Sequence, residues 1–219
     1  MRLVLVRHGE SIWNAEGRYQ GHADPGLTER GRAQATVTAR LLAREYADAD
    51  LLLRSDLQRV AETAALTEAV LDVDVSVDER LREIDLGTWS GLTREEVAER
   101  DPEGFQAWTR CEDASLLRRG GGETYAELRE RVWSVLREVS RGDGNVLIFT
   151  HGGPIRAAVA AALGLTMRQE VRLAGVGNCS LTLLEWRSDL PRLFAYNRTC
   201  HLRACLPAGV PELNDRPPG

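Results

Sequence analysis

An arginine and a histidine stand side by side where an apolar run near the start of the chain ends. Residues 3–6 are all aliphatic, and Arg7, His8 and Gly9 follow them directly. A continuous aliphatic run is typical of a strand that is buried on both faces of a sheet. The glycine permits close backbone approach, and the two basic side chains suit an oxyanion such as phosphate. The sequence therefore predicts an anion site at the carboxyl end of this strand.

Two further expected strands also end near basic side chains. The strand at 51–53 is followed by Arg59 in the first turn of a helix, and the strand at 145–150 is followed by His151. The carboxyl ends of neighbouring parallel strands meet at one edge of a sheet, so these side chains are expected to lie close to the first pair. A helix that begins after a strand also presents backbone N–H groups to an anion.

The elements that must position these residues alternate between strand and helix. This alternation predicts an α/β fold, a three-layer α/β/α sandwich with a mostly parallel central sheet. Thr28 is the expected N-cap of one helix, and Ser55 or Asp56 that of another. Apolar residues on one helical face predict the main helices. These helices are expected over 28–46, 57–70, 123–140 and 154–163.

The length of 219 residues suits a single domain, 1–219. Residues 92–144 are expected to form an inserted helical cap over the site, and the proline-rich stretch 207–219 a flexible tail. Alternating apolar residues at 73–77 predict an edge strand, through which a second copy of the chain could pair as a homodimer.

The composition excludes several classes of protein. The net charge of −5 argues against a nucleic-acid partner, and no run approaches the roughly 18 apolar residues of a membrane span. All 28 cationic side chains are arginine, which rules out a lysine Schiff base and a P-loop lysine. The four cysteines lack metal-type spacing and are interpreted as reduced thiols of a cytoplasmic protein. They are Cys111, Cys179, Cys200 and Cys205.

Taken together, these residues resemble the histidine phosphatase superfamily, also called the phosphoglycerate mutase-like family. The resemblance spans nearly the whole chain and rests on six motifs in the family's order. The motifs are Arg7-His8-Gly9-Glu10-Ser11 with Asn14, Leu27-Thr28 with Gly31, Ser55-Asp56-Leu57-Gln58-Arg59 with Thr63-Ala64, Leu81-Arg82-Glu83 with Gly87, Trp89 and Gly91, Gly121-Gly122-Glu123, and Thr150-His151-Gly152-Gly153.

The resemblance implies that His8 is a nucleophile that forms a phosphohistidine, which water then hydrolyses. The attacking nitrogen must be neutral, so the other ring nitrogen is expected to donate to a backbone carbonyl. Arg7 and Arg59 are implied to hold the phosphoryl oxygens, and His151 to donate to one of them. Glu83 is implied to protonate the leaving oxygen and then to activate water.

Further residues complete the expected site. Asn14 and Gly152 are expected to contribute donors to the phosphate. Gln20, Arg118 and Arg119 are candidate substrate-binding residues. No metal and no cofactor is implied, because arginine and histidine supply the positive charge.

The leading hypothesis is a metal-independent phosphatase of a small phosphorylated metabolite, a sugar phosphate or a phosphoglycerate-type phosphomonoester. A cofactor-dependent phosphoglycerate mutase is the alternative, and a module that only binds phosphorylated ligands is the third. The phosphatase is favoured by the short interval between Glu83 and His151 and by Gly153, because mutases carry asparagine at that place. The intact set of nucleophile and proton donor argues against a pure binding module.

Overall fold

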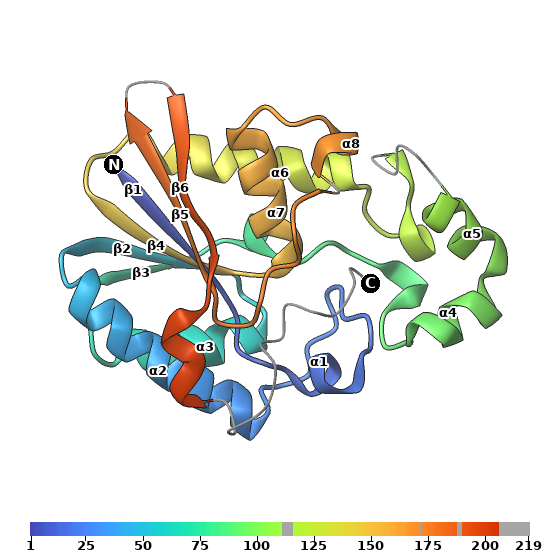
Figure 1. Cartoon of the computed structure of the whole chain (residues 1–219), viewed down its shortest axis with the longest axis horizontal. Coiled ribbons are helices and arrows are strands. Elements are labelled where there is room, and N and C mark those ends of the chain that lie inside the picture. The colour runs from blue at the N-terminus through green and yellow to red at the C-terminus, as the bar shows by residue number, and fades with distance from the viewer. Residues whose placement is uncertain (111–115, 171, 188–189, 206–219) are drawn as a thin grey trace.

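The computed structural model describes residues 1–110, 116–170, 172–187 and 190–205. A six-stranded sheet runs through its centre in the order β3-β2-β4-β1-β5-β6 (Figure 1). The first four of these are parallel to one another, whereas β5 and β6 are antiparallel at one edge, so the predicted mostly parallel sheet is confirmed. The strands are β1 Arg2–Arg7, β2 Ala49–Arg54, β3 Asp74–Val77, β4 Asn145–Thr150, β5 Leu181–Arg187 and β6 Leu190–Arg198.

Helices cover both faces of the sheet. In Figure 1, α2 and α3 lie on one side of the strands and α6 and α7 on the other. The α-helices are α1 Ile12–Glu16, α2 Glu29–Glu45, α3 Gln58–Glu68, α4 Arg94–Arg100, α5 Pro102–Arg110, α6 Tyr125–Val139, α7 Gly152–Ala162 and α8 Met167–Glu170. Short 3-10 helices are η1 Glu79–Leu81, η2 Gly87–Trp89, η4 Arg119–Gly121 and η5 Cys200–Cys205.

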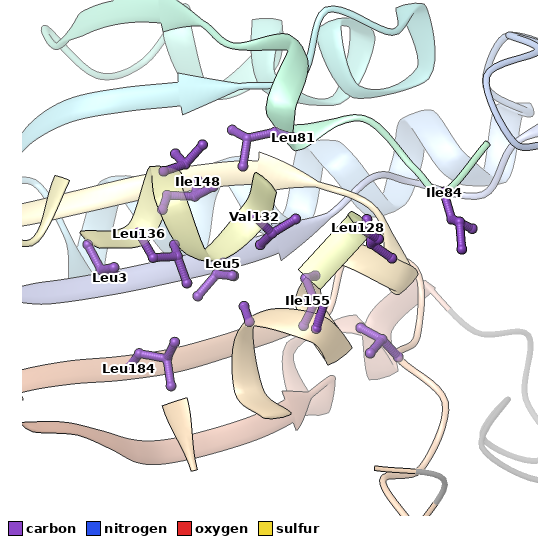
Figure 2. Close-up of a cluster of buried hydrophobic side chains, with 14 of the residues drawn as sticks. Leu3, Leu5, Leu81, Ile84, Leu128, Val132, Leu136, Ile148, Ile155 and Leu184 are labelled. Atoms are coloured by element: carbon purple, nitrogen blue, oxygen red, sulfur yellow. The ribbon is translucent and has the colours of Figure 1, made fainter. Parts of the chain in front are cut away.

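The aliphatic run of β1 is explained by its central place. Leu3 and Leu5 point to one face, where they share a core cluster with Leu128 of α6 (Figure 2). Val4 and Val6 point to the other face, into the cluster that α2 and α3 cover. Alternate side chains of a strand point to opposite faces, so a strand with two covered faces has no polar positions.

The described part of the predicted insertion 92–144 contains the α-helices α4, α5 and α6, which have different surroundings. Helices α4 and α5 project from one end of the sandwich, as Figure 1 shows. Helix α6 instead packs on the sheet, where Leu128 and Leu136 are fully buried. An aromatic cluster joins the projecting part to the rest, with Trp108 of α5 lying 5.9 Å from Trp89 and 6.3 Å from Tyr19 between ring centroids.

The N-terminus of α3 corrects one prediction. The predicted cap of Thr28 on α2 is confirmed, but Ser55 and Asp56 do not cap α3. Its N-cap is Leu57, which has no side-chain acceptor, and the first two backbone N–H groups of the helix donate to the carboxylate of Asp24. Asp56 is unavailable because it accepts from Arg82, at 2.8 Å from Nε.

Three other predictions concern the periphery. The expected edge strand at 73–77 is β3, where Val75 and Val77 are exposed, and self-association through it stays a prediction. The expected flexible tail 207–219 and Cys111 lie outside the described residues. Within the described ranges, no helix is long and apolar enough to cross a membrane. Cys179 is buried, and Cys200 is an exposed free thiol.

Candidate active site

His8 follows β1 directly and is 2% exposed. Its Nδ1 lies 2.7 Å from the carbonyl oxygen of Gly9, so Nδ1 carries the proton and Nε2 keeps a lone pair. Burial holds the pKa of His8 well below its usual range, and the guanidinium groups of Arg59 and Arg7 lower it further. The structure shows the expected contact of the other ring nitrogen with a backbone carbonyl.

His151 is the N-cap of α7, and its ring centroid lies 5.3 Å from that of His8. Its Nε2 is 3.1 Å from the hydroxyl oxygen of Ser55. The backbone N–H of Leu57 also donates to this hydroxyl oxygen, at 3.4 Å. Burial lowers the pKa of His151 well below its usual range.

Arg59, in the first turn of α3, is completely buried. Its Nη1 donates to the carbonyl of Ala23 at 2.8 Å and to Asp24 at 3.2 Å, and its Nη2 donates to the carbonyl of Gly21 at 2.9 Å. The loop after α1 therefore binds both Nη atoms of the guanidinium group, whereas Nε of Arg59 has no hydrogen-bond partner.

Arg7 is the last residue of β1, and its Nη1 donates to the carbonyl of Val176. Gly152 lies beside it, since a Cβ atom added there would be 3.6 Å from Nε of Arg7. That Nε is buried without a partner, like Nε of Arg59 and Nδ1 of His151. Buried donors are normally bonded, so unsatisfied donors on three neighbouring residues indicate a site for an oxygen-rich anion.

The side chain of Glu83 lies at the N-terminus of α7, although Glu83 itself belongs to the segment after β3. Its carboxylate accepts from the backbone N–H of Gly153, at 3.1 Å and 3.2 Å, and from that of Ile84 at 2.9 Å. Electrostatic attraction to Glu83 raises the pKa of both Arg7 and Arg59, against the stronger effect of their burial. The structure thus brings the predicted proton donor to the edge of the anion site.

Asn14 and Gln20 belong to the segment between β1 and α2. The side-chain oxygen of Asn14 accepts from Asn178 at 3.1 Å, and Asn178 also donates to the backbone carbonyl of His8 at 3.1 Å. Gln20 accepts from the Ser11 hydroxyl at 2.8 Å, so its side-chain oxygen is used within the loop.

The two arginines predicted as substrate contacts have different surroundings. Arg118 is exposed, donates to the backbone carbonyl of Gly122 and pairs with Glu127. Arg119 instead lies over the ring of Trp108, 5.8 Å from its centroid, and is close enough to Glu83 for the carboxylate to raise its pKa against burial. Of the two, Arg119 is the one with an electrostatic interaction with Glu83.

Arg131 of α6 is a site residue that sequence reasoning missed. Its Nη1 donates to the backbone carbonyls of Arg80, at 2.6 Å, and Arg82, at 2.7 Å, and its Nη2 to that of Glu83 at 2.9 Å. An ion pair with Glu123 holds the guanidinium group in place at 2.6 Å. This arginine therefore fixes the backbone that carries Glu83.

Asp24, Asn178 and Ser55 also support the site. Ser55, like Glu123, belongs to one of the family motifs in the sequence and could have been found there, whereas Asp24 and Asn178 lie in irregular loops with no sequence signal. No group of three or more metal-binding side chains is found in the part of the chain that the structure describes.

Known proteins resemble this chain over most of its length. A family model described as "Histidine phosphatase superfamily (branch 1)" matches residues 3–199. Phosphoserine phosphatase 1 of Hydrogenobacter thermophilus is 37% identical over 92% of this chain and 94% of that protein. Glucosyl-3-phosphoglycerate phosphatase of Mycolicibacterium vanbaalenii is 36% identical over 82% of this chain and 81% of that protein. A solved structure of mycobacterial glucosyl-3-phosphoglycerate phosphatase with VO3 has a TM-score of 0.81 at 32% identity, over 90% of this chain and 99% of that one.

Proposed function

Because the chain belongs to the histidine phosphatase superfamily, we propose that it hydrolyses a small phosphorylated metabolite through a phosphohistidine on His8. The observation that carries this proposal is the state of the His8 ring, which is neutral, has a free Nε2 and lies beside three buried donors without partners. A ring in this state is a nucleophile, and the donors suit the oxygens of a phosphoryl group.

In the first step, Nε2 of His8 forms a bond to phosphorus while the bond from phosphorus to the leaving oxygen breaks. Glu83 gives its proton to that oxygen, so the alcohol leaves uncharged. Arg7, Arg59 and Nδ1–H of His151 hold the three remaining phosphoryl oxygens as charge shifts onto them.

In the second step, water attacks the phosphorus of the phosphohistidine. Glu83 takes the proton that the water loses, the phosphorus–nitrogen bond breaks, and inorganic phosphate leaves. His8 returns to its neutral state, with Nδ1–H again bonded to the carbonyl of Gly9. In this scheme the positive charge comes from arginine and histidine, and no divalent metal takes part.

Two relatives are named as phosphatases of phosphoserine and of glucosyl-3-phosphoglycerate, which supports a small phosphomonoester as the substrate. The deep burial of His8 favours the same class over a macromolecular phosphate. We propose that the enzyme is cytoplasmic, because the exposed thiol of Cys200 would stay reduced there. Cell fractionation with an antibody to the chain tests this location.

Phosphate release from a panel of metabolites in EDTA tests the activity. The panel contains 3-phosphoglycerate, glucosyl-3-phosphoglycerate, phosphoserine, sugar phosphates and nucleotides. We expect hydrolysis by the native protein and its loss in His8→Ala, since the variant lacks the nucleophile. Equal activity in both proteins would show that His8 does not attack phosphorus.

Rapid quenching with a labelled substrate tests the intermediate. We expect an acid-labile phosphoenzyme that is absent from His8→Ala. Isomerisation of phosphoglycerate that 2,3-bisphosphoglycerate stimulates would instead identify a mutase. Tight phosphate binding without turnover or phosphoenzyme would identify a binding module.

A further inference from the structure

A histidine in the loop between α1 and α2 contacts the backbone of the residue that would act as the proton donor. Nε2 of His22 lies 2.9 Å from the backbone carbonyl oxygen of Glu83, although the two residues are 61 positions apart. A carbonyl oxygen can only accept, so Nε2 carries the proton and donates it. The side chain of His22 is exposed, so the contact is not a consequence of burial in the core.

The carbonyl of Glu83 receives donors from two separate parts of the chain. Arg131 of α6 donates to it through Nη2, also at 2.9 Å. A carbonyl oxygen has two lone pairs, and His22 and Arg131 together use both. The backbone of Glu83 is therefore fixed by two elements, whereas its carboxylate is held by the backbone N–H groups of Ile84 and Gly153.

The loop that carries His22 also holds an arginine of the phosphate site. The residues on either side of His22, Gly21 and Ala23, accept through their backbone carbonyls from the guanidinium group of Arg59, at 2.9 Å and 2.8 Å. Asp24 accepts from the same group at 3.2 Å. One short segment thus contacts both Arg59, which would bind the phosphoryl group, and the residue that would protonate the leaving oxygen.

Close packing places this loop against the segment that follows Glu83. Gly21 has a φ of +52°, and a Cβ atom there would lie 2.8 Å from the hydroxyl oxygen of Ser90 and 3.0 Å from the backbone nitrogen of Leu86. The pKa of Asp56 is lowered by hydrogen bonds from Arg82 and also by attraction to His22. The position of the His22 ring is therefore supported by its surroundings as well as by its contact with Glu83.

We propose that His22 is a positioning residue, which holds Glu83 at the distance from the phosphoryl group that proton transfer requires. The proposal rests on the proposed function, because that function makes Glu83 the proton donor. Proton transfer needs donor and acceptor within hydrogen-bond reach, and a displacement of about 1 Å can cost about 100-fold in rate. Without the donor on His22, the carbonyl of Glu83 would be held from α6 alone.

His22→Phe and His22→Gln form a matched pair of variants. Phenylalanine keeps an aromatic ring but has no donor. Glutamine loses the ring but carries an N–H donor the same number of bonds from the backbone as Nε2 of histidine. A change that appears in His22→Phe and is absent from His22→Gln therefore comes from the hydrogen bond to Glu83.

Amide hydrogen exchange, followed by NMR, measures the placement of Glu83 without turnover. The first N–H groups of a helix have no acceptor within the helix, so the N–H of Gly153 is protected by the Glu83 carboxylate. We expect this amide to exchange about tenfold faster in His22→Phe and at the native rate in His22→Gln. The amide of Arg59, which donates to Asp24, reports on the rest of the loop and should keep its rate in both variants.

The leaving group separates a loss of proton transfer from general damage to the site. The alcohol of phosphoserine must be protonated as it leaves, whereas 2,4-dinitrophenyl phosphate releases a phenolate that is stable without a proton. The measurement is kcat/KM, which reports the steps up to the departure of the leaving group. We expect His22→Phe to lose about 10- to 100-fold on phosphoserine and nothing on 2,4-dinitrophenyl phosphate. His22→Gln should keep both activities.

Several outcomes overturn the proposal. An unchanged Gly153 amide in His22→Phe would show that the carboxylate of Glu83 stays in place without His22. Equal acceleration of the Gly153 and Arg59 amides, or an equal loss of kcat/KM on the two esters, would show that His22 only stabilises its loop. Equal effects in His22→Gln and His22→Phe would assign the role to the ring instead of the hydrogen bond.

The exchange measurement also separates this proposal from the proposed function. If the native protein hydrolyses no phosphomonoester, the proposed function fails. The Gly153 amide still decides in that case whether His22 holds Glu83 in place, because its exchange rate does not depend on turnover.

Discussion

At the scale of residues, hydrogen bonding gives His8 and His151 different chemistry. The carbonyl of Gly9 can only accept, so it fixes the proton of His8 on Nδ1 and leaves Nε2 as a nucleophile. In the proposed mechanism, Nε2 of His151 accepts from the hydroxyl of Ser55, 3.1 Å away, and Nδ1 of that ring carries the proton that it donates to the phosphoryl group. The two buried imidazoles, whose ring centroids are 5.3 Å apart, thus have different proposed roles, one as a nucleophile and the other as a hydrogen-bond donor.

Gly153→Ala tests how closely Glu83 must be placed. A Cβ atom at residue 153 would overlap Oε1 of Glu83, whereas one at Gly152 would make an ordinary contact with Arg7 at 3.6 Å. We expect Gly153→Ala to lower kcat by about 10- to 100-fold, because a displacement of about 1 Å is enough for such a loss. Steady-state kinetics measures it, and Gly152→Ala should lose less. An unchanged kcat in Gly153→Ala would mean that Glu83 has room to move.

At the scale of elements, the site is assembled from the first turns of helices and fixed by distant side chains. Helix α3 carries Arg59, and α7 brings the glycine that holds Glu83. Both helices begin where a parallel strand ends, which explains why their first turns meet. Asp24 then joins α3 to the loop before α2, and Arg131 joins α6 to the segment that carries Glu83.

Asp24→Ala should lower stability and phosphate affinity together. Asp24 caps α3 and pairs with the buried Arg59, at 3.2 Å. We expect a loss of about 1–2 kcal/mol in the free energy of unfolding, and a rise of about tenfold in the inhibition constant of inorganic phosphate. Thr28→Ala is the control, because it removes the cap of α2 without touching Arg59. Equal effects of the two variants on phosphate inhibition would contradict the role of Asp24 at the site.

Arg131→Lys should affect catalysis more than binding. Lysine keeps the charge beside Glu123 but lacks the planar fork that reaches the carbonyls of Arg80, Arg82 and Glu83. We expect kcat to fall by about tenfold while KM changes little, since the loosened segment carries the proton donor. The control is Arg137→Lys, on the exposed side of the same helix. A parallel change in kcat and KM would indicate a general loss of structure.

At the scale of the whole molecule, burial of three histidines links stability to pH. His8, His151 and His201 all have pKa values below the usual range because of burial, that of His201 lowered to about 4. As the pH falls below about 6.5, the unfolded chain binds protons that the folded chain does not. The contribution of these histidines to the free energy of unfolding is therefore fully present above about pH 6.5 and is lost progressively below it.

Urea unfolding between pH 7.5 and 5 tests this linkage. Each histidine that stays neutral in the folded protein should contribute about 1.4 kcal/mol per pH unit below its unfolded pKa. His201→Gln should reduce the slope of the free energy of unfolding against pH by about 1.4 kcal/mol per pH unit, which corresponds to one proton. The variant also changes the contact with the Thr38 hydroxyl, 3.1 Å from Nε2. The lowered pKa values of acidic groups such as Asp56 act at lower pH. A stability that stays constant down to pH 5 would show that the histidines are protonated in the folded state.

The pattern of residue types along the chain indicates which segments are buried and which residues follow them. Leu3 to Val6 form an unbroken aliphatic run because both faces of β1 are covered, and such a run is visible in the sequence. The order of strands and helices then placed His8, Arg59 and His151 at one edge of a parallel sheet. Periodicity and order are local properties of the chain, so they can be read without coordinates.

Which side chains meet across long separations in the sequence depends on the tertiary fold. Asp24 caps a helix that begins more than thirty residues later, and Arg131 binds carbonyls about fifty residues away. Arg118 and Arg119 are identical neighbours in the sequence, yet one pairs with Glu127 and the other lies over the ring of Trp108. The direction of a side chain depends on the backbone turn that carries it and on the partners that packing brings near. Neither is recorded in the spacing of residue types.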